Sequence, residues 1–356
     1  MRASLRVVPL LALTYSVACG QSPGGPPTQL EPILQPQSIA SEALFIGISP
    51  VDENVVWLAG TAGTFARTVD GGETWAAGIV AGADTLQFRD VHAVDEATAY
   101  LLSIGNGQSS RIYKTDDAGA TWTLQFENSE ADAFFDCMDF WDANNGLAFS
   151  DAVDAVFRLI MTDDGGQTWT RIPADRLPPA LPGEGSFAAS GTCLITVGDS
   201  TAMFGTGAGG RASVARTNDR GETWTLSDTP IIQGSSAQGI ATLAFRDKLN
   251  GLAAGGDISD QEQFADNVAI TNDAGRTWQS APHPTFTGAI YGAAVVTGAP
   301  TPTFVVVGPK GASYSTDNAM TWTALDSLEY WSTAFVSPTA GWMIGPNGRI
   351  TKVVFE

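Results

Sequence analysis

Three carboxylates occupy places where an acid or a base could act. Asp136 interrupts the apolar run 134–140, where a carboxylate costs stability unless it is hydrated or paired. Glu184 stands between two glycines after a proline-rich stretch, and Asp151 follows the next apolar run. Two carboxyls about 5–9.5 Å apart can cleave a glycoside, so Asp136 with Glu184 or Asp151 is the candidate catalytic pair. The alternative is structural: an Asp bonded to water or backbone, and a solvated loop Glu.

Other chemistries have less support. The two histidines, His92 and His283, lie far apart and are not flanked by acidic or cysteine residues at a ligand spacing, which disfavours a zinc site or a Ser-His-Asp triad. The glycine run 205–210 is not followed by a helix that could bind phosphate. The acidic loop 257–266 lacks the spacing of an EF-hand. We expect neither a metal nor a cofactor.

One short pattern recurs six times and must organise whatever site exists. Each copy reads Thr or Ser, any residue, Asp, any residue, Gly or Ala, any residue, Thr, Trp, and we call it the repeated turn. Its Asp and Trp residues are Asp70 and Trp75, Asp117 and Trp122, Asp164 and Trp169, Asp219 and Trp224, Asp273 and Trp278, and Asp317 and Trp322.

Each position of the repeated turn has a physical role. The Asp carboxylate can accept hydrogen bonds from backbone N–H groups of its own turn, and the Gly two places later supplies a positive φ. The Trp offers a large apolar surface for packing between units. We therefore expect the six Asp residues to be structural. The sixth copy has Ala319 in the glycine position, which predicts a turn that is strained or differently shaped.

The spacing of the repeated turns predicts a β-propeller. Consecutive Trp residues are between 44 (Trp278 to Trp322) and 55 (Trp169 to Trp224) residues apart, the period of a four-stranded blade. Strand-like runs such as 43–48 and 55–59 precede each turn. The segment 330–356 has three such runs, which makes seven blades, and Leu30–Leu34 is expected to supply its missing outer strand. The predicted fold is an all-β, seven-bladed propeller of four-stranded antiparallel blades over residues 29–356.

The repeated turn resembles the Asp-box, or BNR, motif of sialidase-like propellers. Three further stretches, 110–114, 134–151 and 177–190, resemble bacterial relatives of the photosystem II stability/assembly factor. The resemblance covers nearly all of the chain after about residue 40 and implies the fold. It implies function weakly, because proteins of this group carry unrelated functions on one scaffold.

In sialidase-like propellers, ligands bind on the face opposite the Asp boxes. Mapping the chain onto that layout brings together Asp136 and Glu184 at inner-strand entrances, and Arg111, Asp151, Asp154, Arg211, Asp257 and Asp260 in the middle loops. Asp136 would face the central channel, and Arg111, Arg211 and Asp257 are the ligand-binding candidates. A sialidase also needs an arginine cluster. Arg111 and Arg158 share one register relative to their Trp, but no third arginine matches it strictly.

Composition and the first residues bear on the compartment and partners. The formal net charge of −20 disfavours nucleic acid. Residues 1–19 read as an export signal, with Cys19 as the acylated residue of a lipoprotein and 20–28 as a flexible tether; ordinary cleavage and release is the alternative.

Cys137 and Cys193 are expected to be buried free thiols, although a bridge is possible in an exported protein.

Two functional hypotheses follow. The first is a non-enzymatic scaffold in the bacterial cell envelope, periplasmic or on the outer surface, that binds an envelope protein or a glycan. We expect a monomer that touches the membrane only through its lipid anchor. The second is an extracellular, sialidase-like glycoside hydrolase that uses Asp136, Asp151 or Glu184. The sequence does not say whether a site at the channel mouth is active or vestigial.

Overall fold

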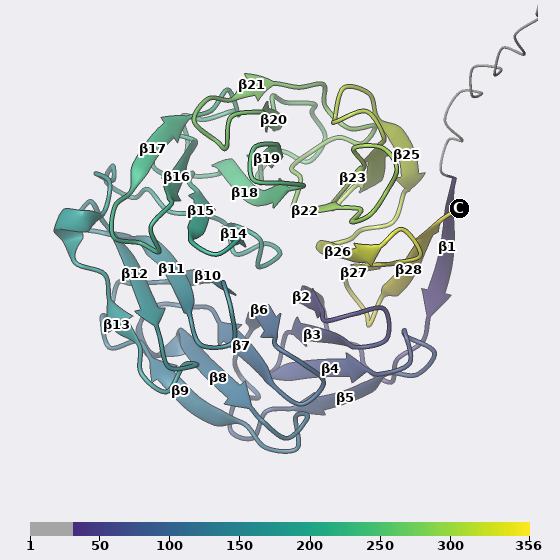
Figure 1. Cartoon of the computed structure of the whole chain (residues 1–356), viewed down its shortest axis with the longest axis horizontal. Coiled ribbons are helices and arrows are strands. Elements are labelled where there is room, and N and C mark those ends of the chain that lie inside the picture. The colour runs from purple at the N-terminus through teal and green to yellow at the C-terminus, as the bar shows by residue number, and fades with distance from the viewer. Residues whose placement is uncertain (1–30) are drawn as a thin grey trace, which may run out of the picture. The chain divides into compact units, whose positions relative to one another are not determined.

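The computed structural model describes residues 31–356, and the predicted signal (1–19), Cys19 and tether (20–28) lie outside the described residues. Within that range the chain forms seven antiparallel sheets of four strands each, arranged around a centre (Figure 1). The predicted fold class and blade count are confirmed. Two short 3-10 turns, η1 (Gly107–Ser109) and η2 (Ala174–Arg176), lie in connections between strands.

Six blades follow one another along the chain, each with its inner strand first. Blade one consists of β2 (Phe45–Pro50), β3 (Val56–Gly60), β4 (Thr64–Thr68) and β5 (Ala76–Ile79). Blade two consists of β6 (Phe88–Ala93), β7 (Ala99–Ser103), β8 (Arg111–Thr115) and β9 (Thr123–Glu127). Blade three consists of β10 (Phe135–Phe140), β11 (Gly146–Val153), β12 (Val156–Thr162) and β13 (Thr170–Arg171). Blade four consists of β14 (Leu194–Val197), β15 (Thr201–Gly205), β16 (Ser213–Thr217) and β17 (Thr225–Asp228). Blade five consists of β18 (Gln238–Phe245), β19 (Gly251–Asp257), β20 (Val268–Thr271) and β21 (Gln279–Ser280). Blade six consists of β22 (Gly292–Val295), β23 (Phe304–Gly308), β24 (Gly311–Ser315) and β25 (Thr323–Asp326).

The seventh blade joins the two ends of the propeller. Its strands β26 (Ser332–Ser337), β27 (Ala340–Ile344) and β28 (Ile350–Phe355) are completed by β1 (Pro32–Gln37), which pairs with β28 from Pro32 opposite Phe355 to Gln37 opposite Ile350. Figure 1 shows β1, in purple, beside β28, in yellow. The closing strand is thus where the sequence predicts it, displaced by a few residues toward the C-terminus. It covers the edge that β28 would otherwise expose.

The six repeated turns connect the third and fourth strands of blades one to six. In the first, Asp70 Oδ1 accepts hydrogen bonds from the N–H of Thr74 at 2.9 Å and the hydroxyl of Thr68 at 2.7 Å, while Oδ2 accepts from the Thr74 hydroxyl. These hydrogen bonds, that of the Thr74 hydroxyl foremost, lower the pKa of Asp70 to about 2. The other five aspartates accept the equivalent bonds.

The sixth turn keeps this shape at the expense of strain. Ala319 has a φ of +64° and its N–H is bonded to the Ser315 hydroxyl at 2.9 Å, as the glycines of the other turns are. A left-handed φ is unfavourable for a residue with a Cβ. The sequence predicts a turn that is either strained or differently shaped, and the structure shows the strained one.

The core lies between blades, where the tryptophans of the repeated turns pack against the preceding sheet. Trp122 of blade two, for example, makes edge-on contacts with Trp57 and Phe65 of blade one, with ring centroids 6.1 and 5.1 Å apart. Trp57 itself is fully buried. Each turn thus helps to fasten its blade to the previous one.

Antiparallel order divides the connections between two faces. The repeated turns lie on the same face as the connections between first and second strands, and we call this the turn face. The connections between second and third strands, and those between blades, lie on the other, which we call the mouth face. All the site residues proposed from the sequence, apart from the turns themselves, are near the mouth face.

Candidate functional site at the mouth face

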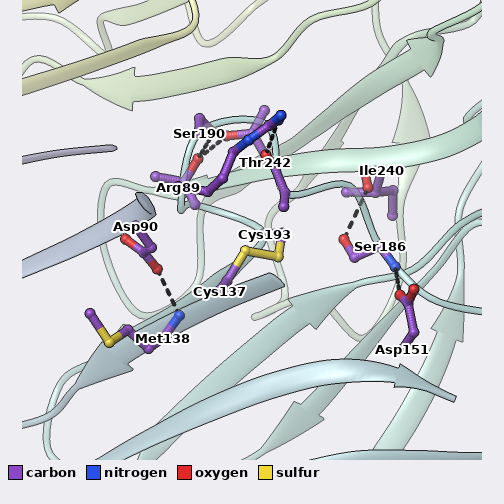
Figure 2. The surroundings of a disulfide bond; sticks show 12 residues. Arg89, Asp90, Cys137, Met138, Asp151, Ser186, Ser190, Cys193, Ile240 and Thr242 are labelled. Carbon is purple, nitrogen blue, oxygen red and sulfur yellow. Dashed lines mark hydrogen bonds between the residues drawn. A yellow bond between two sulfur atoms is a disulfide. The ribbon is translucent and has the colours of Figure 1, made fainter. Parts of the chain in front are cut away.

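A segment between blades three and four lies across the centre of the mouth face. This segment, residues 185–193, is here named the plug. Arg89 of blade two donates to the carbonyl of Ala188 at 2.9 Å, and the Ser332 hydroxyl of blade seven donates to the carbonyl of Ser190 at 3.2 Å. The plug is therefore held from two sides of the ring. Figure 2 shows Ser186, Ser190 and Cys193 of the plug together with Arg89.

Further contacts fix the plug to the inner strands beneath it. The hydroxyls of Thr192 and Thr242, the latter on β18, are 2.7 Å apart. Gly191 has a φ of +80°, and a Cβ there would lie 2.3 Å from Asp90 Oδ1. Asp90 is itself buried and accepts N–H bonds from Val91 and Met138, both at 2.7 Å, so it ties β6 to β10. Burial raises the pKa of Asp90 well above its usual range.

A disulfide bond closes the plug at its end. Cys137 on β10 is bonded to Cys193, with Cα atoms 6.0 Å apart, and both residues are buried (Figure 2). The expectation of two free thiols is wrong, and the alternative of a bridge holds. The reason is topological: Cys193 directly precedes β14, and this inner strand of blade four lies beside β10, the inner strand of blade three.

Asp136, which is buried, and Asp151, which is partly buried, form an interacting pair of carboxyls. Asp136 is only 1% exposed and stands at a bulge of β10, between Phe135 and Cys137. Burial raises its pKa well above the usual range, and the charge of Asp151 raises it further. Burial also raises the pKa of Asp151 to about 6, although Asp151 Oδ1 accepts the N–H of Ser186 at 3.0 Å. The pair retains a proton well above the pH at which an exposed Asp loses it.

Arg89 is a member of this site that the sequence reasoning missed. It occupies the bulge of β6, between Phe88 and Asp90, as Asp136 occupies that of β10. Its guanidinium lies 5.0 Å from the ring centroid of Trp331 in blade seven. Burial lowers its pKa, while the charge of Asp136 raises it. Arg89 Nε and Asp136 Oδ2 are both buried without a hydrogen-bond partner. The signal available in the sequence was the shared Phe before each charged residue.

Glu184, the residue just before the plug, is buried and forms a pair with the partly exposed Arg211. Glu184 is 0% exposed, and its Oε2 and Oε1 accept hydrogen bonds from Nη2 and Nε of Arg211 at 2.6 and 3.1 Å. The N–H of Leu181 also donates to Oε2, at 2.8 Å. The N–H of Ala152 donates to the backbone carbonyl of Glu184 at 2.9 Å, which places the two carboxyl-bearing segments side by side.

Arg111 and Asp257 make their contacts within their own blades. Arg111 Nε lies 3.1 Å from Glu127 and also donates to the carbonyl of Gln108 at 2.7 Å. Asp257 accepts from Gln238 and from Ser259, at 2.9 and 2.6 Å. The structure thus gathers Asp136, Asp151, Glu184 and Arg211 around the plug and engages Arg111 and Asp257 elsewhere. Five of these six side chains, all but Asp136, form hydrogen bonds or an ion pair with other residues of the chain.

Between residues 31 and 356, no group of three or more His, Cys, Asp or Glu side chains is arranged to hold a metal ion. No helix in this part of the chain is long and apolar enough to cross a membrane.

The fold and its central segment define a seven-bladed β-propeller whose mouth is plugged by its own chain. Comparisons agree on the fold. No protein-family model matches the chain, and no curated protein matches it either. A solved structure described as YCF48 bound to D1 peptide is similar with a TM-score of 0.64 at 14% identity, over 91% of this chain and 97% of that one.

Other propellers are similar to a comparable degree. YCF48 from Cyanidioschyzon merolae gives a TM-score of 0.61 at 14% identity, over 90% of this chain and 98% of that one. The WD40 repeats of RRP9 give 0.62 at 10% identity, over 91% and 97%. Identities this low establish a shared fold alone.

Proposed function

We propose that this chain is an exported, non-enzymatic scaffold that binds a protein partner on its mouth face. The observation that carries the proposal is the state of the candidate acids: Asp136 and Glu184 are 1% and 0% exposed, and Glu184 is neutralised by Arg211. A glycosidase needs its two carboxyls open to the sugar and to water. These carboxyls are buried within the protein, which favours the scaffold over the hydrolase.

The mouth face has apolar side chains that a partner could cover. Four large ones are exposed in its connections, namely Leu181, Ile258, Phe264 and Leu328, and the turn face exposes Val69, Leu249 and Met320. The two faces can therefore be compared directly by substitution. One similar structure, YCF48, is described with a D1 peptide bound, so a propeller of this shape can hold a peptide.

The test uses two matched sets of substitutions in the full chain. One set changes Leu181, Ile258, Phe264 and Leu328 to Ser; the other changes the exposed Val69, Leu249 and Met320 of the turn face to Ser. Each protein is cross-linked to envelope extracts, and the captured proteins are identified. We expect one defined partner to be lost from the first set and kept by the second.

A different pattern would overturn the proposal. Cleavage of glycosides from a panel by the purified protein, abolished by Glu184→Gln, would support the hydrolase. Binding of glycans from an array, without any protein partner, would show a glycan scaffold instead.

The anchor and compartment are proposed on the signal-like residues 1–19 alone. We expect Cys19 to be acylated, and the protein to remain on the envelope membrane through that lipid. Metabolic labelling with a fatty acid, compared between the native chain and Cys19→Ser, tests this directly. A labelled native chain and an unlabelled variant are expected, whereas equal release of both into the medium would indicate an ordinary signal peptide.

A further inference from the structure

A cavity of about 320 Å³ lies between blades two and three. Phe126 of β9 and Arg171 of β13, which are the outer strands of the two blades, line it together with the buried Phe135 of β10. Pockets that bind small molecules usually have volumes of about 300–1,000 Å³. No residue of the plug lines this cavity, so it is separate from the candidate site described above.

The charges around this cavity do not balance. Glu130 is the only acid that lines it, whereas Arg158 and Arg171 are both lining residues. Arg158 is 8% exposed, and its Nη2 and Nε donate to Oε1 and Oε2 of Glu130 at 2.7 and 2.9 Å. Hydrogen bonds from Arg158 lower the pKa of Glu130, so its carboxylate is ionised at neutral pH. One carboxylate therefore pairs with two guanidiniums, which leaves one positive charge on a protein whose net charge is −20.

Arg171 carries the remaining positive charge. Its side chain is 50% exposed, and its one hydrogen bond to residues 31–356 joins Nη1 to Glu130 Oε2 at 3.4 Å. A guanidinium has five N–H donors, and two donors on one of its edges match the two oxygens of a carboxylate. Most donors of Arg171 are therefore available to a ligand that enters the cavity.

The other repeated turns indicate that the fold does not require an arginine at position 171. Arg171 is the second residue after the Trp of its turn, and the equivalent residues are Ala77, Leu124, Leu226, Ser280 and Ala324, none of which is charged. Arg158 stands eleven residues before the same Trp, where the equivalent residues are Thr64, Arg111, Ser213, Asn267 and Gly311. Blade three is the only one of the six with an arginine at both positions. The excess of positive charge is thus a local feature of this cavity.

Aromatic side chains form much of the remaining lining. Phe126 and Trp169 are both half-buried. Phe126 makes an edge-on contact with Phe135, with ring centroids 5.3 Å apart, and Trp169 makes one with Phe140 at 5.9 Å. Ile160, which is 5% exposed, adds an aliphatic surface. Apolar walls with a few charged groups are typical of pockets that orient a small ligand, and here the charge selects an anion.

We propose that this cavity binds an organic carboxylate with a flat apolar body, whose carboxylate pairs with Arg171 and whose body packs against Phe126 and Trp169. The inference goes beyond the proposed scaffold, because it assigns a small-molecule site whose residues are not among those proposed to bind the protein partner. A small inorganic anion would gain the charge attraction but not the apolar contacts.

The test uses 2-naphthoate as probe and 2-naphthamide, an uncharged compound of nearly the same shape, with binding to the full chain measured by saturation-transfer NMR titration. We expect saturable binding of naphthoate and about tenfold weaker binding of naphthamide, because the amide loses the charge-assisted pair of hydrogen bonds. Acetate has the charge without the apolar body, and at equal concentration it should not displace naphthoate. Displacement by acetate would contradict the role of the aromatic walls.

A variant taken from the repeats themselves tests Arg171. Arg171→Leu places at this position the residue type that Leu124 and Leu226 provide in blades two and four, so the fold should tolerate it. It should weaken naphthoate binding about tenfold and remove the preference over naphthamide. Arg276→Leu removes the same charge from an exposed position in the repeated turn of blade five and should leave binding unchanged.

Three results would overturn the proposal. They are the absence of saturable naphthoate binding, equal binding of the two probes to the native chain, and an equal loss of binding in Arg171→Leu and Arg276→Leu. The last would indicate non-specific charge attraction. Capture of a protein partner by the mouth face involves none of these residues, so either proposal can fail while the other stands.

Discussion

Glu184 and Arg211 meet through two hydrogen bonds, at 2.6 and 3.1 Å, across 27 residues of sequence, with the carboxylate completely buried and the guanidinium partly open to solvent. Removing one member of such a pair leaves an uncompensated buried charge. We therefore expect Arg211→Met to lower the free energy of unfolding by about 3 kcal/mol or more. Urea denaturation of the purified variant measures this.

An exposed ion pair serves as the control for Arg211. Arg176 and Glu222 are 3.1 Å apart, and both are substantially exposed. Arg176→Met is expected to cost less than about 1 kcal/mol. Equal losses for the two variants would mean that the buried pair contributes no more than a surface one. Arg211→Met combined with Glu184→Leu should recover part of the loss, because no buried charge remains.

The carboxyl pair predicts a pH dependence of opposite sign to that of the repeated turns. The pKa of Asp151 is raised from 3.8 to about 6 in the folded chain, and that of Asp136 is raised too. The folded state therefore binds more protons than the unfolded one, so this pair's contribution to stability falls as the pH rises from about 4 through 6. Asp136→Asn should increase stability at pH 7 by about 1–3 kcal/mol and have little effect near pH 4. Thermal unfolding at several pH values tests both.

Asp164→Asn provides the comparison. The pKa of Asp164 is lowered by its hydrogen bonds to the N–H and hydroxyl of Thr168, so its contribution is present above the unfolded pKa and is lost as the pH falls through its folded pKa. The substitution should destabilise at pH 7 and matter less in acid. A loss of stability for Asp136→Asn at pH 7 would show that its ionised form is needed.

The disulfide should stabilise both the ring and the plug. Cys137 and Cys193 are 56 residues apart, and a closed loop of that length corresponds to about 4 kcal/mol of lost chain entropy in the unfolded state. We expect Cys137→Ala/Cys193→Ala to lower the denaturation midpoint accordingly. Hydrogen exchange within 185–193 should rise as well. Unchanged exchange there would indicate that hydrogen bonds alone retain the plug.

A conformational prediction concerns Ala62. This exposed residue has a φ of +56°, which disfavours any side chain with a Cβ. Ala62→Gly should therefore raise the free energy of unfolding by about 0.5–1 kcal/mol. Ala76→Gly, the same chemical change in the exposed strand β5, should lower it by a similar amount. The same sign for both would show that the backbone angle is not the cause.

The fold could be predicted from the sequence because the geometry of each repeated turn is specified by residues within the turn itself. Thr68, Asp70 and Trp75 specify a turn and an interblade contact within eight residues, and the copy number then gives the ring. β1 is located to within a few residues because the segment 330–356 has three strand-like runs and no repeated turn, so the last blade lacks an outer strand. Such inferences need only local sequence patterns and the number of times that each pattern occurs.

The site was less accessible because it depends on contacts between distant segments. In the sequence, Glu184 is a candidate acid with a solvated loop Glu as the alternative, and nothing around it indicates that Arg211 neutralises it. The charges of Arg89 and Asp136 act on each other only in the folded ring, and Cys193 reaches Cys137 only because β14 lies beside β10. Burial and pairing are therefore what sequence reasoning could not supply.

The closure of the seventh blade also bears on the order of folding during synthesis. β1 emerges first, yet its hydrogen-bonding partner β28 is the last strand of the propeller, so the ring cannot be completed until almost the whole chain is available. Pro32 and Phe355 lie opposite each other, which means that a short linker between these two ends would make β28 and β1 a simple hairpin. A circular permutant opened at a surface connection would then form its most distant pairing first, as a local event.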